Sequence, residues 1–543
     1  MKLPLSNRLR QQWGEYRNQI RINHIARQVA AHAPDASGRQ PLLAMNVSSR
    51  ITGLSQNSAF TLLTSWGLQL AGVPVIHFVC RSGMSHCVLG INRQNYYTPP
   101  PCGKCISQSQ RLYGQAQCYW FKYKPDESLE ASLQGLDIAG LSAFEYRDPA
   151  GPFDIPMPLG KLTIPALRWT LRRHTLPDDE PTRYLFRQFM LSAYSIALQF
   201  NHLIEETHPY AALIFNGIMF PEASARWAAS QRGLRVITHE VGFQRFSSFF
   251  TDGEATAYPV KIPDSFELTS KQESQLDEYL EKRFQGKFTM AGIRFWPEMK
   301  GLDEAFKQKA SAFKQIVPVF TNVIYDTSQV HANTLFEHMF AWLEMVLQII
   351  KAHPETLFVI RAHPDEMRPG TAKQSRESVH DWVFDNRVND LPNVVFIDSQ
   401  EYISSYELIQ LSKFIMVYNS SIGLEAALMG AAVLCAGKAR YTQYPIVFLP
   451  GSAQEYLQMA DRFLNIEKID IPGYFRCNAR RFLYYQLYRI SMSFTEFLQN
   501  GARPGFVRLK HFNWQQLLPQ NNPVIKTIYH GIMQNKPFML EEN

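Results

Sequence analysis

The sequence predicts an α/β fold of two doubly wound domains, each built on a parallel sheet. Apolar runs of strand length alternate with longer helical segments over residues 42–238 and again over residues 316–436. The length of 543 residues also exceeds what one hydrophobic core usually supports. We therefore expect one domain over residues 1–300, a second over residues 301–472, and C-terminal helices with a tail over residues 473–543.

Composition restricts the classes of partner. Lys and Arg (55) outnumber Asp and Glu (48), which gives a net charge of +7. This mild excess suits anionic ligands or a lipid surface, and it is too diluted by acids to indicate a nucleic-acid partner. The sequence contains no apolar stretch of about 18 to 20 residues that would span a bilayer, and its start lacks a signal-peptide core. We therefore expect a cytoplasmic protein with reduced cysteines.

The first 32 residues predict a basic amphipathic helix. Arginines alternate with Trp13, Tyr16 and Ile20 across residues 6–32. Such a helix either packs on its own domain with solvated arginines or docks peripherally on the inner face of a membrane. Both interpretations remain open at this point.

Four cysteines fall within 26 residues. Cys102 and Cys105 have the C-x2-C spacing that lets two thiolates reach one tetrahedral ion, and Cys80 and Cys87 precede them. The sequence thus predicts a structural zinc site. The alternative is a set of inert or redox-paired thiols, because free cysteine is often a core residue.

Polar groups also follow a predicted strand of the first domain. Residues 236–238 form an apolar run, and His239, Glu240 and Gly242 come directly after it. Two titratable groups at a strand end can act as a general base if they face a cleft. A surface loop with an ordinary ion pair is the alternative.

The main phosphate-binding signal lies in the second domain. An apolar run over residues 414–418 ends in Asn419, and Ser420, Ser421 and Gly423 follow at the start of a predicted helix. Such a turn presents backbone N–H groups and a positive dipole end to a phosphate. Glu425, about one turn inside, would repel phosphate but could accept hydrogen bonds from ribose hydroxyls. An ordinary capped helix is the alternative interpretation.

A second signal lies one crossover away. Arg361, His363 and Pro364 follow the strand predicted over residues 356–360, and the proline favours an extended His363. A histidine there can hydrogen-bond a phosphate oxygen or protonate a leaving group, and arginine offers a fixed positive fork. No Asp-x-Asp pair stands at a strand end, so we expect leaving-group stabilisation without a metal.

These motifs carry a resemblance to a known family. Arg-x-His-Pro after a strand, Ser-Ser-x-Gly-x-Glu-Ala-x-x-x-Gly and the later Tyr441 resemble bacterial capsule-polysaccharide biosynthesis glycosyltransferases, including Kdo transferases, over residues 316–445. The resemblance implies a GT-B arrangement, in which two Rossmann-like domains face a cleft and the C-terminal one holds a nucleotide sugar. By resemblance, His363 would contact the donor phosphate, residues 420–423 would cradle it and Glu425 would hold the ribose.

The same resemblance implies a CMP-, UDP- or GDP-linked donor and a polysaccharide or lipid-linked glycan acceptor. It does not supply a catalytic base; Glu240 is the first candidate, followed by Asp326 and His239. Two other functions fit the pattern: a polyol-phosphate transferase like the teichoic-acid polymerases, and a non-catalytic scaffold in a polysaccharide assembly complex.

Overall fold

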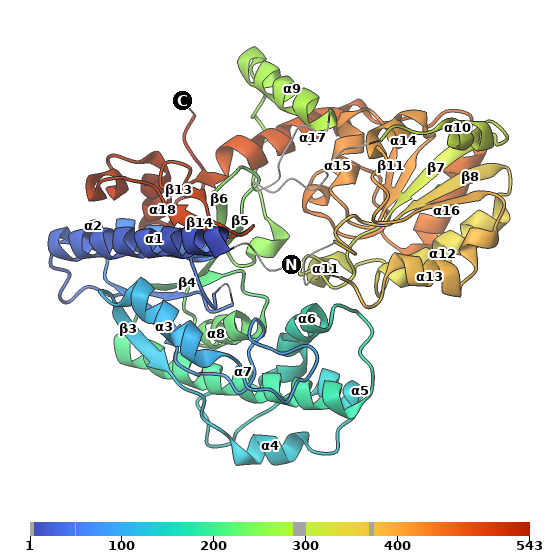
Figure 1. Ribbon diagram of the computed structural model, residues 1–543. Helices are drawn as coiled ribbons and strands as arrows, with labels where there is room; N and C mark the ends of the chain where they lie inside the picture. Colours follow the sequence, from blue (N-terminus) through green and yellow to red (C-terminus); the bar gives the residue numbers. More distant parts are fainter. Residues whose placement is uncertain (1–4, 49, 286–299, 369–373, 543) are drawn as a thin grey trace.

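The computed structural model describes residues 5–48, 50–285, 300–368 and 374–542, with side chains from residue 12 onward. Two sheets, each flanked by helices, form separate bodies in the first and second halves of the chain (Figure 1). The predicted α/β class with two Rossmann-like domains is confirmed.

The first sheet has seven strands in the order β12-β6-β5-β4-β1-β2-β3. Its five parallel strands are β1 (Leu42–Met45), β2 (Val75–Cys80), β3 (Gln117–Phe121), β4 (Ala211–Phe215) and β5 (Val236–Val241). Two antiparallel strands, β6 (Ser247–Asp252) and β12 (Met492–Ser493), extend one edge. The sequence pattern did not predict these two, and they make the first sheet mixed.

The second sheet has five parallel strands in the order β11-β10-β7-β8-β9. Its strands are β7 (Gln315–Phe320), β8 (Thr356–Arg361), β9 (Val394–Ile397), β10 (Ile415–Val417) and β11 (Val433–Cys435). The chain winds outward from β7 first to β8 and β9, then to β10 and β11 on the other side. This reversal opens a crevice at the carboxyl ends of β7, β8 and β10, where such sheets bind ligands.

The helices follow the expected segments closely. Those of the first half are α1 (Leu5–His32), α2 (Gln56–Leu70), α3 (Cys102–Tyr113), α4 (Glu127–Leu133), α5 (Ile138–Ala143), α6 (Leu159–Leu171), α7 (Glu180–Thr207) and α8 (Phe220–Gln231). Those that follow are α9 (Ser270–Phe284), α10 (Glu304–Ala310), α11 (Gln329–Ala332), α12 (Met339–Ala352), α13 (Val379–Asp385), α14 (Ser405–Leu411), α15 (Ile422–Leu428), α16 (Ala453–Asn465), α17 (Gly473–Tyr484) and α18 (Pro523–Gln534). Within the described residues, no helix is both long enough and apolar enough to cross a bilayer.

Helix α7 illustrates how local sequence sets these bounds. Asp179 caps its start by accepting a hydrogen bond from the Thr182 N–H, and Pro181 occupies the first turn, where its missing N–H costs nothing. The helix ends at His208, whose backbone is left-handed (φ 43°). Its buried face joins the first-domain core and packs against α8 and α6.

Residues 492–542 complete the first domain instead of forming a separate extension. Strand β12 pairs with β6, and α18 packs against α2 (Figure 1). Ile525 of α18 lies so close to Gly67 of α2 that a Cβ at Gly67 would overlap it. The reason is burial: the apolar face of α18 and the hairpin strands β13 (Leu498–Asn500) and β14 (Val507–Leu509) share a core with β1 and α2. Helix α17 packs instead on α15 of the second domain.

Candidate active site

A cavity of about 240 Å³ lies at the carboxyl ends of β7, β8 and β10. Residues from both halves of the chain line it. The first half supplies Trp169, Arg172, Thr256 and Ala257; the second supplies Asn322, Val323, Tyr325, Asp326, Ser328, His331, His363, Asp365, Asn419, Ser420, Ser421, Lys438, Ala439, Arg440 and Tyr441. The predicted cleft between two domains therefore exists, and it coincides with the crevice of the second sheet.

A hydrogen bond joins the two walls of this cavity. Thr256, from a short 3-10 turn after β6, and His331 of α11 lie 2.8 Å apart between Oγ1 and Nε2. The other nitrogen of His331, Nδ1, faces Glu254 at 3.3 Å. This contact brings a first-domain loop onto the second domain at the cavity edge.

His363 lies at the rim with a defined proton position. Its Nδ1 accepts a hydrogen bond from the Asp365 N–H over 3.1 Å, so the neutral ring carries its proton on Nε2. Burial lowers the pKa of His363, against the opposing effect of Asp365 and Asp326. A neutral histidine with a fixed Nε2–H is therefore available to donate to a ligand in the cavity.

Asp326 faces the same cavity from the loop after β7. Its carboxylate accepts a hydrogen bond from the Ser328 hydroxyl over 2.7 Å, and the residue is exposed. The carboxylate is thus oriented from one side and open to solvent on the other. This is the arrangement that a general base for an incoming hydroxyl requires.

The turn after β10 is positioned by Tyr441. The Tyr441 hydroxyl donates to the Ser420 carbonyl oxygen over 2.8 Å. Ser421 is the N-cap of α15; its side chain makes no cap hydrogen bond, and the residue lines the cavity. A Cβ on Gly423 would overlap the Tyr441 hydroxyl, so glycine is needed there for packing against tyrosine and not for direct approach to a ligand.

The charges of the cavity wall are mainly positive. Arg172, Lys438 and Arg440 outnumber Asp326 and Asp365 among its fully charged side chains. Arg440 stacks over the rings of Phe243 and Tyr258, at 4.7 and 4.2 Å from their centroids, which holds its guanidinium in place. Arg172 stacks on Trp169 at 4.0 Å, with a left-handed backbone (φ 61°). Such a wall suits an anionic ligand.

Glu425 does not face the cavity, contrary to the expected ribose contact. Its Oε1 pairs with Arg283 of α9 at 2.5 Å, and its Oε2 accepts a hydrogen bond from Tyr406 of α14 at 2.5 Å. The side chain is 6% exposed. Because α15 turns this position toward α9 and α14, the carboxylate is used within the domain.

Arg361 is also directed away from the cavity. It is the last residue of β8, 3% exposed, and its guanidinium donates to the Glu401 carbonyl oxygen over 3.2 Å. Burial lowers its pKa to about 10. Its predicted role as a phosphate fork does not fit this position, because the guanidinium is already bonded inside the domain, whereas His363 lies beyond the end of β8 and reaches the rim.

His239 and Glu240 lie within β5 and not in a loop after it. The strand continues to Val241 because β6 pairs with it. His239 is fully buried, its Nε2 lies 2.9 Å from Thr61 Oγ1, and burial lowers its pKa to about 3. It is therefore a core residue and not a base.

Glu240 lies near the cavity but is not part of its lining. Its carboxylate accepts hydrogen bonds from the Val241 N–H and from Asn216, at 2.7 and 2.5 Å, and burial raises its pKa. It interacts electrostatically with Asp326 and Arg440 without lining the cavity. Of the three predicted base candidates, only Asp326 faces the cavity.

Several lining residues were not anticipated from the sequence. Lys438 and Arg440 follow β11 directly, so the strand-end rule that selected His363 could have found them. Trp169 lies in α6 and Arg172 directly follows it, in a stretch (residues 120–185) for which the sequence predicts only loops and short helices. No local pattern marks them, because only the packing of the two domains brings them to the cavity.

The four predicted zinc ligands lie together in a different cavity, in the first domain. Among the described side chains, no three His, Cys, Asp or Glu residues converge closely enough to hold a single metal ion. The predicted mononuclear site is therefore not formed in this arrangement of the cysteines.

One family model matches part of the second half of the chain. Residues 293–446 match the model of the family described as "Capsule polysaccharide biosynthesis protein". This segment contains β7, β8, β10 and most of the cavity lining. The match confirms, for this segment, the resemblance to capsule-polysaccharide biosynthesis proteins. No curated protein matches the chain.

Similar solved structures include two Thermosulfurimonas dismutans KpsC structures and one epimerase. The KpsC beta Kdo 2,4 transferase has 14% identity and a TM-score of 0.33, with 52% of this chain and 80% of that chain covered. The KpsC beta Kdo 2,7 transferase has 13% identity and a TM-score of 0.31, with 62% and 89% covered. The Neisseria meningitidis UDP-GlcNAc 2-epimerase bound to UDP-GlcNAc has 14% identity and a TM-score of 0.25, with 55% and 81% covered.

Proposed function

We propose that this chain is a glycosyltransferase of capsule-polysaccharide biosynthesis, which moves a sugar from a nucleotide-sugar donor to a polysaccharide or lipid-linked glycan. The observation that carries the proposal is the single cavity that brings His363, with its fixed Nε2–H, together with the Ser420–Ser421 turn. Both lie in the segment that matches the capsule family model.

In this proposal the donor phosphate lies between His363 and the turn after β10. The Nε2–H of His363 and the Ser421 hydroxyl donate hydrogen bonds to its oxygens, and Lys438 and Arg440 add positive charge. As the bond to the sugar breaks, negative charge grows on the leaving phosphate. Donors already held in place stabilise that charge without a metal ion.

Asp326 takes the role of general base. It lies in the loop after β7, its carboxylate is oriented by Ser328, and it shares the cavity with His363. The carboxylate accepts the proton of the acceptor hydroxyl as that oxygen forms the new glycosidic bond. The first-domain residues Trp169 and Arg172 then form the acceptor-side wall, since they face the cavity from the opposite domain.

The test is a donor screen with two matched variants. Purified protein is incubated with CMP-Kdo, UDP-sugars, GDP-sugars and CDP-glycerol, and release of free nucleotide is measured with and without a glycan acceptor. We expect turnover of a nucleotide sugar that Asp326→Asn lowers by about 10²-fold or more, the usual contribution of a general base. Glu240→Gln, next to the cavity but not in its wall, should lower it much less.

Other outcomes of the screen overturn the proposal in identifiable ways. Turnover of CDP-glycerol alone would support the polyol-phosphate transferase. Tight nucleotide binding, seen as a raised melting temperature without turnover of any donor, would support a non-catalytic scaffold.

We also propose that α1 brings the enzyme to the cytoplasmic face of a membrane. Its inner face (Ile22, Ile25 and Val29) is buried against the first domain, whereas Trp13, Tyr16 and Ile20 are 62%, 59% and 51% exposed. These three side chains recur at helical spacing and share their face with Arg17 and Arg27, which are exposed as well. Exposed aromatics flanked by arginines suit the headgroup region of an anionic bilayer.

A further inference from the structure

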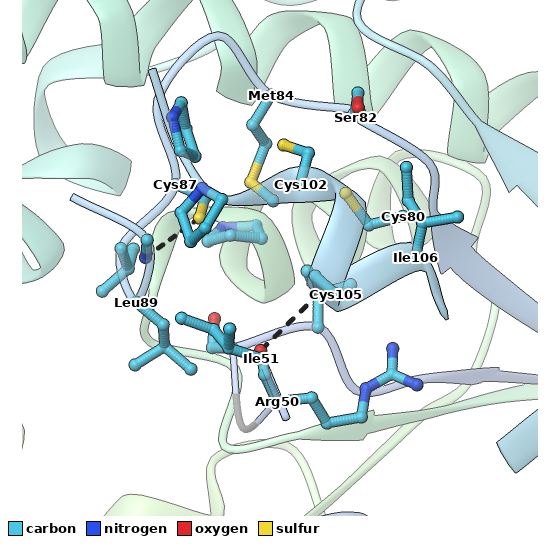
Figure 2. A pocket seen from close by; sticks show the side chains of 17 residues that line it. Arg50, Ile51, Cys80, Ser82, Met84, Cys87, Leu89, Cys102, Cys105 and Ile106 are labelled. Atoms are coloured by element: carbon cyan, nitrogen blue, oxygen red, sulfur yellow. Dashed lines mark hydrogen bonds between the residues drawn. The ribbon is translucent and has the colours of Figure 1, made fainter. Parts of the chain in front are cut away.

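Four cysteines of the first domain surround a second cavity, which shares no lining residue with the candidate active site. Cys80 ends β2, Cys87 lies in the loop that follows, and Cys102 and Cys105 occupy the first turn of α3. Figure 2 shows these side chains entering one space from three segments of the chain. None of the four forms a disulfide.

Two of the sulfurs are held by backbone donors. The Gly83 N–H donates to Cys80 Sγ over 3.2 Å, and the Gly90 N–H donates to Cys87 Sγ over 3.1 Å. A Cβ at Gly90 would come within 2.6 Å of Cys87 Sγ, so the glycine is required for this approach. Backbone hydrogen bonds to sulfur stabilise a metal-bound thiolate and orient it.

The other two sulfurs lie at a helix N-terminus. Helix α3 has 12 residues, and Pro101 at its N-cap makes no side-chain cap hydrogen bond. The helix dipole favours negative charge on Cys102 and Cys105. The site therefore offers two different supports for thiolate charge, one for each pair of cysteines.

The surroundings of the sulfurs are largely apolar, with Ser48, Arg50 and Ser82 as the polar lining residues. Val47, Met84, Val88 and Ile106 line the same cavity. Four thiolates in this cavity would carry more negative charge than Arg50 alone can neutralise, so they require a further cationic partner.

The arrangement of the four sulfurs indicates whether they would hold a single metal ion or a polynuclear centre. All four sulfurs line one cavity, yet no three of the described His, Cys, Asp or Glu side chains converge on a point that one ion would occupy. A polynuclear centre places inorganic atoms between its thiolate ligands and so accepts wider spacing. Four cysteine thiolates are the ligand set of [4Fe–4S] clusters.

We propose that Cys80, Cys87, Cys102 and Cys105 ligate a [4Fe–4S] cluster. Each thiol loses its proton as its sulfur bonds to one iron, and the cluster fastens the loop over residues 81–101 and the start of α3 to the end of β2. This inference is independent of the glycosyltransferase activity, because it concerns a separate cavity and has its own readout.

The experiment measures iron, acid-labile sulfide and zinc in the full chain purified without oxygen. We expect about four iron and about four sulfide per chain, with the broad visible absorbance of an iron–sulfur centre. Stoichiometric zinc without sulfide would overturn the cluster and favour a mononuclear site. If the purified protein contains no metal and all four of these cysteines react with a thiol reagent, any metal site here would be overturned.

Variants locate the ligands. Cys102→Ser and Cys105→Ser should each lose most of the iron and sulfide, whereas Cys477→Ser, at an exposed position of α17, should retain both. Unchanged iron and sulfide in both ligand variants would overturn the assignment. Should a ligand variant fail to fold, the iron and sulfide content of the wild-type chain decides the question by itself.

Discussion

The hydroxyl of Tyr441 donates a hydrogen bond to the carbonyl oxygen of Ser420 over 2.8 Å and packs against the bare Cα of Gly423. Two segments that are separate in sequence, the turn after β10 and the 3-10 turn after β11, are thereby fixed to each other at the floor of the cavity. The position of the proposed phosphate-binding turn thus depends on a tyrosine about 20 residues later in the chain.

Gly423→Ala should displace this turn. The new methyl group overlaps the Tyr441 hydroxyl, and overpacking of this kind costs about 1–3 kcal/mol. We expect a lower melting temperature and a higher donor KM. Gly473→Ala is the matched control, because a Cβ there has open space. Equal behaviour of the two variants would contradict the role of the Tyr441 contact.

His363→Ala should lower kcat by about 10²–10³, the usual effect of removing one preorganised donor to a developing oxyanion. The fold should persist, since the ring is at the rim of the cavity. His353→Ala is the control: it removes another histidine that precedes a proline, one that pairs with Glu355 and Asp461 at the end of α12. Steady-state kinetics of both variants measure the difference, and an unchanged kcat for His363→Ala would rule out the phosphate contact.

Glu425→Ala should reduce stability and not primarily donor binding. Its removal leaves the Arg283 guanidinium buried without its carboxylate, and breaking such a pair costs about 3–5 kcal/mol. The control is Glu278→Ala, which breaks the exposed pair between Glu278 and Lys282 of α9 and should change stability very little, because solvent screens this pair. Denaturant unfolding measures both changes. A specific rise in donor KM at unchanged stability would instead restore the ribose contact expected from the sequence.

Glu366 should make the stability of the protein depend on pH. Its side chain is fully buried, one oxygen accepts the Val379 N–H over 2.9 Å, and burial raises its pKa to about 8. The folded state therefore retains a proton that the unfolded chain releases above about pH 4.5. This contribution to stability is complete below that pH and is lost as the pH rises to about 8, by at most about 1.4 kcal/mol per pH unit.

Glu366→Gln should remove the pH-dependent contribution of this side chain to the free energy of unfolding. The free energy of unfolding, measured from pH 5 to pH 8, should fall less steeply in the variant than in the wild type. Glu344→Gln, on the exposed face of α12, should keep the wild-type slope. Identical slopes for all three proteins would show that Glu366 ionises normally.

Trp13→Ala combined with Tyr16→Ala should weaken binding to anionic vesicles by about tenfold or more, because two large exposed aromatic side chains are lost from α1. Co-sedimentation with vesicles measures this, and added salt should weaken the wild-type interaction through Arg17 and Arg27. Tyr474→Ala removes a similarly exposed tyrosine (56%) from α17 and serves as the control. A wild-type chain that does not sediment with vesicles would exclude α1 docking.

Much of the fold followed from local sequence. The alternation of apolar runs with helical segments predicted the parallel strands of both sheets, since strands buried on two faces need continuous apolar residues. The strand-end rule found His363, Ser420 and Ser421, because the carboxyl ends of parallel strands meet at one edge of the sheet. Asp326 was found in the same way, from the loop after β7.

Other outcomes were decided by tertiary contacts alone. Glu425 pairs with Arg283 of α9, more than 100 residues earlier, and with Tyr406 of α14, about 20 residues earlier. No local pattern therefore shows that the charge of Glu425 is already neutralised. His239 became a core residue because β6 pairs with β5 and prolongs it. Trp169 and Arg172 reach the cavity only through the packing of one domain on the other. The sequence determined which side chains stand at the strand ends. The packing between elements decided which of them face a ligand, because a charged or hydrogen-bonding group that is paired inside the protein is not available to bind one.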